Sequence, residues 1–210
     1  IAAVAPGEPD PVLLESFVQQ ELAAARANGT LAKEPFRWEQ ARRAHTGHLS
    51  FPSKIAVSRD GRVAVSDAGH DRVLVTDARG RVLHVVGNGA RGHADGSFEQ
   101  ASFDDPQELS LEGDVLWICD ARNHCVRRAD LRARKIETVA GTGRMGAVMP
   151  DRPAAALGVP LRSPWAIARV GEDLVIAMAG THQLWALDAK AGLIRPWAGS
   201  GREALGDGPL

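Results

Sequence analysis

The sequence has no tyrosine, only two cysteines and only four lysines, and each shortage narrows the range of functions. Cys119 and Cys125 have five residues between them, which is neither the C-x-x-C spacing of a redox motif nor a zinc-ligand spacing. Small buried thiols in a reducing compartment explain them better, so we expect a cytoplasmic protein. A net charge of −1 and the scarcity of lysine argue against nucleic acid as a partner. No apolar run approaches the roughly 18 residues of a membrane span, so we expect no membrane partner.

The sequence does contain an internal repeat, marked by three independent anchors. A proline precedes an apolar strand at Pro52, Pro106 and Pro164, which are 54 and 58 residues apart. The glycine pairs that close the units follow the same two steps: Gly87-Asn88-Gly89, Gly141-Thr142-Gly143 and Gly199-Ser200-Gly201. Between these anchors lies a turn that opens a strand: 67–73, 120–126 and 178–184. Equal steps of separate anchors indicate three copies of one structural unit.

The sequence pattern of each unit predicts four short strands, which are rich in β-branched residues and separated by turn residues. The predicted strands are 54–58, 62–66, 72–77 and 81–87; 108–111, 115–119, 125–130 and 136–140; and 166–170, 174–177, 183–188 and 193–198. Four antiparallel strands in a repeat of this length are typical of a β-propeller blade. We therefore expect an all-β propeller segment over 48–210, with blades at about 49–104, 105–162 and 163–201 and the start of a fourth blade after them.

Two of the turns carry a family resemblance. The sequences 66–73 and 118–126 resemble the NHL-repeat signature: a strand ending in Asp, a Gly/Asn/His turn, then a basic and an aliphatic residue. The third unit, with Ser163-Pro164-Trp165 and 176–187, resembles the branch of this family in which a thioredoxin-like domain precedes the propeller. Cys125 departs from the signature, where Arg is usual, and so does Met178, which replaces Asp. The resemblance covers 49–210 and implies a six-bladed propeller, so that three blades form a partial one.

The two ends of the chain lie outside the three blades. An amphipathic pattern with helix-start and helix-stop residues predicts one helix over 10–28. The resemblance makes 1–47, a helical lead-in and linker, the tail of an upstream thioredoxin-like domain whose redox cysteines lie outside this chain. The basic segment 32–47 is either a contact strip or a solvated linker, and we expect the linker. The sequence 204–210 resembles 92–98, so we expect a fragment of a longer protein; a ring-completing oligomer of three-bladed subunits is the alternative.

The recurring turn residues are the candidate site. Asp67, His70, Asp120, His124 and His182 occupy related positions, and histidines that converge in a propeller are able to hold a divalent metal. We favour an architectural role, in which the repeated Asp accepts backbone N–H bonds of the following turn. We therefore expect no cofactor and no metal.

A ligand or partner surface is a separate hypothesis for the same region. Its candidate residues are His70, Arg72, Arg122, His124, Trp165 and His182, because Arg and Trp are favoured contact residues around concave sites. The hypothesis requires Arg72 and Arg122 not to pair with acidic neighbours.

Motifs of self-sufficient catalysis are missing from the sequence, which contains no G-x-S-x-G, H-E-x-x-H or Walker pattern. We therefore expect no catalytic residues, and a non-catalytic scaffold whose partners are a protein or small-molecule ligand and the remaining blades of the same polypeptide. A metal-dependent lyase or lactonase, which needs three convergent ligands, is one alternative. A propeller that binds single-stranded RNA on a basic face is the other.

Overall fold

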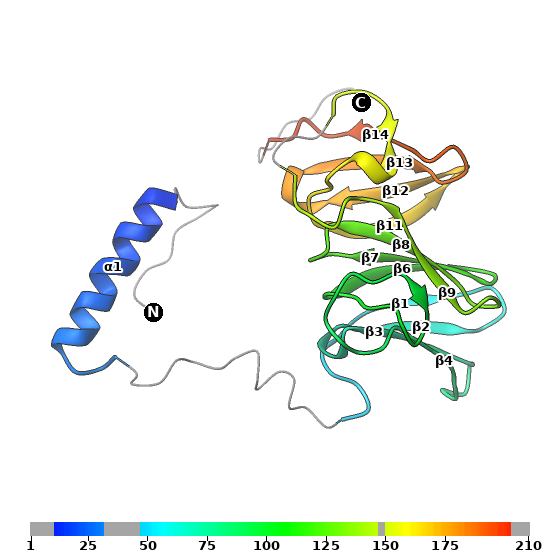
Figure 1. Ribbon diagram of the computed structural model, residues 1–210, viewed down its shortest axis with the longest axis horizontal. Coiled ribbons are helices and arrows are strands. Elements are labelled where there is room, and N and C mark those ends of the chain that lie inside the picture. Colours follow the sequence, from blue (N-terminus) through cyan, green and yellow to red (C-terminus); the bar gives the residue numbers. More distant parts are fainter. Residues whose placement is uncertain (1–10, 32–46, 147–149, 203–210) are drawn as a thin grey trace. The chain divides into compact units, whose positions relative to one another are not determined.

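The computed structural model describes residues 11–31, 47–146 and 150–202 (Figure 1). The chain divides into two compact units, residues 1–41 and 42–210. In the first unit, helix α1 spans Pro11–Ala27, in agreement with the helix predicted over 10–28. The basic residues of 32–46 and the repeat-like sequence 204–210 lie outside the described residues. Among the helices of the described residues, none is long and apolar enough to cross a membrane.

The second unit consists, in its described residues, of three antiparallel sheets that stack side by side (Figure 1). The first sheet has the order β1 (Pro52–Val57), β2 (Val63–Asp67), β3 (Arg72–Thr76), β4 (Val82–Val86). The second contains β6 (Pro106–Glu112), β7 (Val115–Asp120), β8 (Cys125–Asp130) and β9 (Lys135–Ala140). The third contains β11 (Pro164–Val170), β12 (Asp173–Met178), β13 (Gln183–Asp188) and β14 (Leu193–Ala198). Because β6 contacts both β1 and β11, the first strands of the three sheets face one another, and the partial propeller predicted from the repeat is confirmed.

Two details differ from the predicted blades. The first strand of each sheet begins at its proline, which an edge strand tolerates because the missing N–H breaks no ladder bond. Two sheets also have a fifth strand of two residues: β5 (Gly96–Ser97) pairs with β9, and β10 (Ala154–Ala155) pairs with β14. Each short strand belongs to the connection that leaves the preceding blade. The connection therefore crosses to the outer edge of the next blade, which two residues without alternation do not reveal in a sequence.

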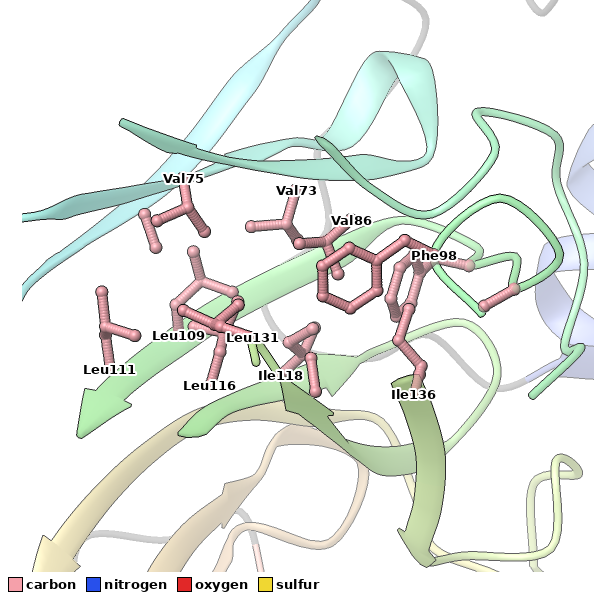
Figure 2. Close-up of a cluster of buried hydrophobic side chains, with 14 residues drawn as sticks. Val73, Val75, Val86, Phe98, Leu109, Leu111, Leu116, Ile118, Leu131 and Ile136 are labelled. Atoms are coloured by element: carbon pink, nitrogen blue, oxygen red, sulfur yellow. The ribbon is translucent and has the colours of Figure 1, made fainter. Parts of the chain in front are cut away.

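The hydrophobic core lies between the sheets. Figure 2 shows the first cluster, in which Val73, Val75 and Val86 of the first blade face Leu109, Leu116 and Ile118 of the second. Phe98, from the connection between these blades, closes the same cluster. A second cluster joins the opposite face of the middle blade, through Trp117, Cys119 and Val126, to the third blade. The middle blade buries both faces, which explains why residues 116–120 are buried without alternation.

Candidate functional site

The three repeated turns lie at the same end of their sheets. In the first blade the register pairs Pro52 with Asp67, and Asp67 with Arg72. The same pairing recurs in the second blade with Pro106, Asp120 and Cys125, and in the third with Pro164, Met178 and Gln183. We call the region formed by residues 67–72, 120–125 and 178–183 the turn end. It brings the predicted site residues to one side of the propeller segment.

Asp67 organises the turn end of the first blade. Its side chain is fully buried, and its Oδ1 accepts the backbone N–H of Ser50 at 2.6 Å. Its Oδ2 lies 2.8 Å from both Arg72 Nε and His70 Nδ1. The predicted architectural role of Asp67 therefore holds, but the backbone donor precedes β1 and does not belong to the following turn. The carboxylate thus connects the segment before β1, through Ser50, with the start of β3, through Arg72.

Asp120 does the same in the second blade with a different cation. Its Oδ1 accepts the N–H of Asp104 at 2.9 Å, and its Oδ2 accepts bonds from Arg127 Nη1 and Asn123 Nδ2, each at 2.8 Å. Arg127 supplies the guanidinium that is missing at Cys125. The two residues are two positions apart on β8, so their side chains leave the strand on the same face. This spacing is the signal in the sequence that points to Arg127, which was not among the predicted site residues.

Arg127 also holds the connection from the first blade. Its side chain is fully buried, and it donates to the carbonyl oxygens of Ser102 and Ala94 at 3.0 and 2.7 Å. A further bond of 2.7 Å reaches Asp95 Oδ1, and the guanidinium lies 5.1 Å from the centre of the Phe103 ring. One buried cation therefore fixes both the turn and the connection beside it.

The third blade lacks the ion pair. Met178, 1% exposed, replaces the Asp, and Gln183 replaces the Arg. Gln183 Nε2 donates to Gly199 O at 3.2 Å, and its Oε1 accepts from Trp185 Nε1 at 3.2 Å. Because the carboxylate and the cation are replaced together, no charge is left without a partner at these two positions.

The sequence of these repeats is similar to that of known proteins. NHL repeat-containing protein 2 of Gallus gallus is 38% identical over 177 residues, which are 74% of this chain and 24% of that protein. The repeats of this chain belong to the NHL family. The chain spans about a quarter of the length of that NHL relative.

Two other known proteins resemble this NHL segment, one in sequence and one in fold. The chloroplastic protein SUPPRESSOR OF QUENCHING 1 of Arabidopsis thaliana is 36% identical over 166 residues, 75% of this chain and 16% of that protein. A structural genomics protein of unknown function from Bacteroides thetaiotaomicron superimposes with a TM-score of 0.51 at 23% identity. That match covers 60% of this chain and 32% of the other, and it supports the fold alone. No protein-family model matches the chain.

Burial sets the electrostatics of the middle NHL blade. It raises the pKa of Asp120 to about 6, although Arg127 and Asn123 act in the opposite direction, so Asp120 is ionised at neutral pH. Burial lowers the pKa of Arg127, but the carboxylates of Asp120 and Asp95 outweigh it and raise that pKa. Burial also raises the pKa of both cysteine thiols, Cys119 and Cys125, well above the ordinary value. Both thiols therefore stay protonated, which removes them as nucleophiles.

The remaining predicted surface residues lie in separate groups. Arg122 Nε is 3.3 Å from Asp105 Oδ2, and Arg72 pairs with Asp67, so both arginines have the acidic partners that the hypothesis required them to lack. His124 Nδ1 accepts the N–H of Ser163 at 3.1 Å, and burial lowers the pKa of His124, which keeps the imidazole neutral for this role.

Trp165 and His182 form a group of their own. They line a hollow of about 440 Å³ on the open flank of the third NHL blade, together with Leu184, and Trp165 is 45% exposed.

The metal hypothesis concerned the Asp and His residues of the same turns. Within residues 11–31, 47–146 and 150–202, no three side chains of His, Cys, Asp or Glu gather closely enough to hold a metal ion. His70 and His124 instead make the contacts with Asp67 and Ser163 given above.

Proposed function

We propose that this NHL segment is a non-catalytic scaffold that binds a protein or small-molecule ligand at the turn end. We further propose that it works within a longer cytoplasmic polypeptide that carries a thioredoxin-like redox domain. One observation carries the first proposal: at the turn end the carboxylates of Asp67 and Asp120 and the thiol of Cys125 are buried, whereas arginine side chains remain accessible. Asp67 and Asp120 are fully buried, and the side chain of Arg122 is 46% exposed.

The burial of the reactive groups supports a scaffold over an enzyme. A general acid, base or nucleophile has to reach the substrate within hydrogen-bonding distance. Asp67, Asp120, Cys119 and Cys125 have no exposed surface. A lyase or lactonase would need three convergent metal ligands, which the described residues do not bring together.

The accessible groups at the turn end suit recognition. Arg72 and Arg122 of the turn end have side chains that are 27% and 46% exposed, and Arg91, in the connection between the first two blades, has one that is 33% exposed. Each is paired with a carboxylate, of Asp67, Asp104 and Asp105 respectively, which rules out the surface of unpaired arginines that the sequence predicted. The proposed contact is instead the exposed face of an ordered, ion-paired guanidinium. Arginine is enriched among residues that dominate binding energy, and its planar group contacts both polar and aromatic surfaces.

The redox context rests on the sequence resemblance and on length. The match with NHL repeat-containing protein 2 leaves about three quarters of that relative outside the compared region. We propose that thiol chemistry belongs to a part of the longer polypeptide that lies outside this chain, because both cysteines of this chain are buried and have raised pKa values.

Site-specific photo-crosslinking tests the binding surface. A photo-reactive residue replaces Arg122 at the turn end or, as the matched control, Arg132, which is 86% exposed in the turn between β8 and β9 at the opposite end. In cells that express the natural protein, we expect a defined crosslinked species from position 122 that is missing from position 132. Equal yields from both positions, or none from position 122, would contradict a binding role for the turn end.

A further inference from the structure

The blades are linked by a hydrogen bond that recurs at equivalent positions. Asp71 and His124 end the turns of the first and second blades in left-handed conformation, with φ of 47° and 50°. Asp71 Oδ1 accepts the N–H of Asp105 at 3.0 Å, and His124 Nδ1 accepts the N–H of Ser163 at 3.1 Å. Both donors stand directly before the proline that begins the next blade. Each turn therefore latches the leading segment of the blade that follows.

An apolar side chain accompanies each latch. Phe103 and Leu161 stand three residues before Pro106 and Pro164, and both are fully buried. Phe103 belongs to the cluster that contains Val73 and Val86 of the preceding blade; its ring atoms lie 2.7 Å from where a Cβ on Gly87 would be. Leu161 belongs to the cluster that contains Val126 and Ala140 of its preceding blade. We call the hydrogen bond the latch, the buried apolar side chain the plug, and the residues just before the proline the leading segment. The latch and the plug together hold the leading segment against the preceding blade.

The receiving surface is a row of three residues across the blade. The rows are Ser66, Val73 and Val86 in the first blade and Cys119, Val126 and Ala140 in the second, all fully buried. The third blade has the equivalent row Ala177, Leu184 and Ala198, in which Leu184 is 37% exposed. This row lies in the 440 Å³ hollow lined by Trp165 and His182.

His182 repeats the geometry of the two latches. It follows the turn of the third blade in left-handed conformation, with φ of 52°. Its imidazole has no hydrogen-bond partner among the residues that the structure describes. Trp165 follows its proline as Ser53 does in the first blade, and Ser53 Oγ donates to Pro106 O of the next blade at 3.3 Å. Both residues therefore occupy positions that contact a following blade elsewhere in this chain.

We propose that the open flank of the third blade receives the leading segment of a further NHL repeat of the same polypeptide. A bulky apolar residue three positions before the proline of that repeat fills the hollow at Leu184. The N–H of the residue before the proline donates to Nδ1 of His182. The proposal rests on the longer polypeptide of the proposed function, but it does not depend on ligand binding at the turn end.

Two observations favour this occupant over a second copy of the chain. The sequence 204–210 resembles 92–98, the connection that supplies β5 and runs on to Phe103 in the second blade. In addition, the glycine pair that closes the third unit keeps the spacing of the other two.

The rate at which an introduced thiol reacts with a maleimide tests the proposal. The natural thiols of Cys119 and Cys125 are fully buried, so we expect them to contribute little labelling of their own. Leu184→Cys is prepared in this chain and in the natural polypeptide that continues beyond it, with any cysteine outside this chain replaced by serine. Val126→Cys is the buried control, and Lys190→Cys, at a side chain 86% exposed, is the accessible control. Labelling with a maleimide is followed by mass spectrometry.

We expect position 184 to label at least tenfold more slowly in the continued polypeptide than in this chain. Position 126 should be protected in both, which also shows that both proteins are folded, and position 190 should label in both. Rapid labelling of position 184 in the continued polypeptide would overturn the proposal. Protection in this chain alone that is lost on dilution would overturn it in favour of a second copy.

If position 184 labels rapidly in the continued polypeptide while position 122 still crosslinks, the packing of a further repeat is wrong and the binding role of the turn end is kept. If position 184 is protected but position 122 does not crosslink, the binding role is wrong and the packing of a further repeat is kept.

Discussion

Replacing Arg127 with methionine removes the buried cation that joins the turn and the connection of the middle blade. Methionine keeps much of the side-chain volume but leaves the carboxylate of Asp120 buried without its cation. The carbonyl oxygens of Ser102 and Ala94 lose their guanidinium donors as well. Breaking one side of a buried ion pair costs about 3–5 kcal/mol. We therefore expect Arg127→Met to lower the free energy of unfolding by about 4 kcal/mol, a large part of the roughly 5–15 kcal/mol of a typical domain.

Urea unfolding followed by tryptophan fluorescence measures this loss. Asp120→Asn in the Arg127→Met background should recover part of it, since an amide oxygen still accepts the N–H of Asp104 without carrying a charge. The loss should also shrink as the pH falls towards 5. Burial raises the pKa of Asp120 and Arg127 lowers it, so removal of Arg127 lets burial raise that pKa further. Protonation of Asp120 on acidification therefore stabilises the variant more than the unmodified chain. Arg132→Met, at an 86% exposed side chain, is the control and should change stability by less than about 0.5 kcal/mol. A loss below about 1 kcal/mol for Arg127→Met, or no recovery by Asp120→Asn, would refute the reasoning.

Three smaller perturbations test the latches and plugs. Burial lowers the pKa of His124 in the folded protein, so the neutral imidazole stabilises the fold fully above the pKa of an unfolded histidine, and this stabilisation is lost as the pH falls below about 6.5. The thermal midpoint of His124→Asn should therefore fall less between pH 7.5 and 5.5 than that of the unmodified chain. Midpoints that fall in parallel would contradict this. A Cβ at Gly141 would clash with the carbonyl oxygen of His124, whereas one at Gly113 meets nothing within 4 Å, so Gly141→Ala should lower the midpoint clearly more than Gly113→Ala, and equal shifts would count against the close packing. Phe103→Ala should cost about 3–5 kcal/mol in urea unfolding because Phe103 is fully buried; the equivalent Leu49→Ala, at a 39% exposed position, should cost far less, and similar costs would argue against the plug assignment.

Much of the fold follows from the sequence because its repeats are marked by backbone requirements. Proline begins an edge strand, and glycine at 87, 141 and 199 adopts φ of 94–97°. These constraints recur at a fixed spacing, so they locate the blades without any knowledge of packing. The two-residue strands β5 and β10 escape prediction because their pairing depends on another blade and not on their own residues.

The candidate site was less accessible to sequence reasoning. The buried role of Asp67 follows from its repetition, but its donor, Ser50, comes from the segment before β1, seventeen residues earlier. Arg127 stands outside the turn motif, and only its spacing of two residues from Cys125 on the predicted strand indicates that it takes the place of the missing cation. The latch acceptors Asp71 and His124 differ chemically and share only a left-handed backbone, which a residue-by-residue comparison of the turns does not display.

The short strands β5 and β10 bear on the order in which the molecule is made. A ribosome releases Gly96–Ser97 before any of the strands of the second blade to which they add an outer edge, and the same holds for Ala154–Ala155 and the third blade. The outer edge strand of each of these two blades is therefore synthesised before the four strands of the blade that it completes. A deletion cut at the boundary between two sequence repeats would strip the outer strand from the blade that remains. Domain dissection of this protein should place its cut sites before these connections and not after them.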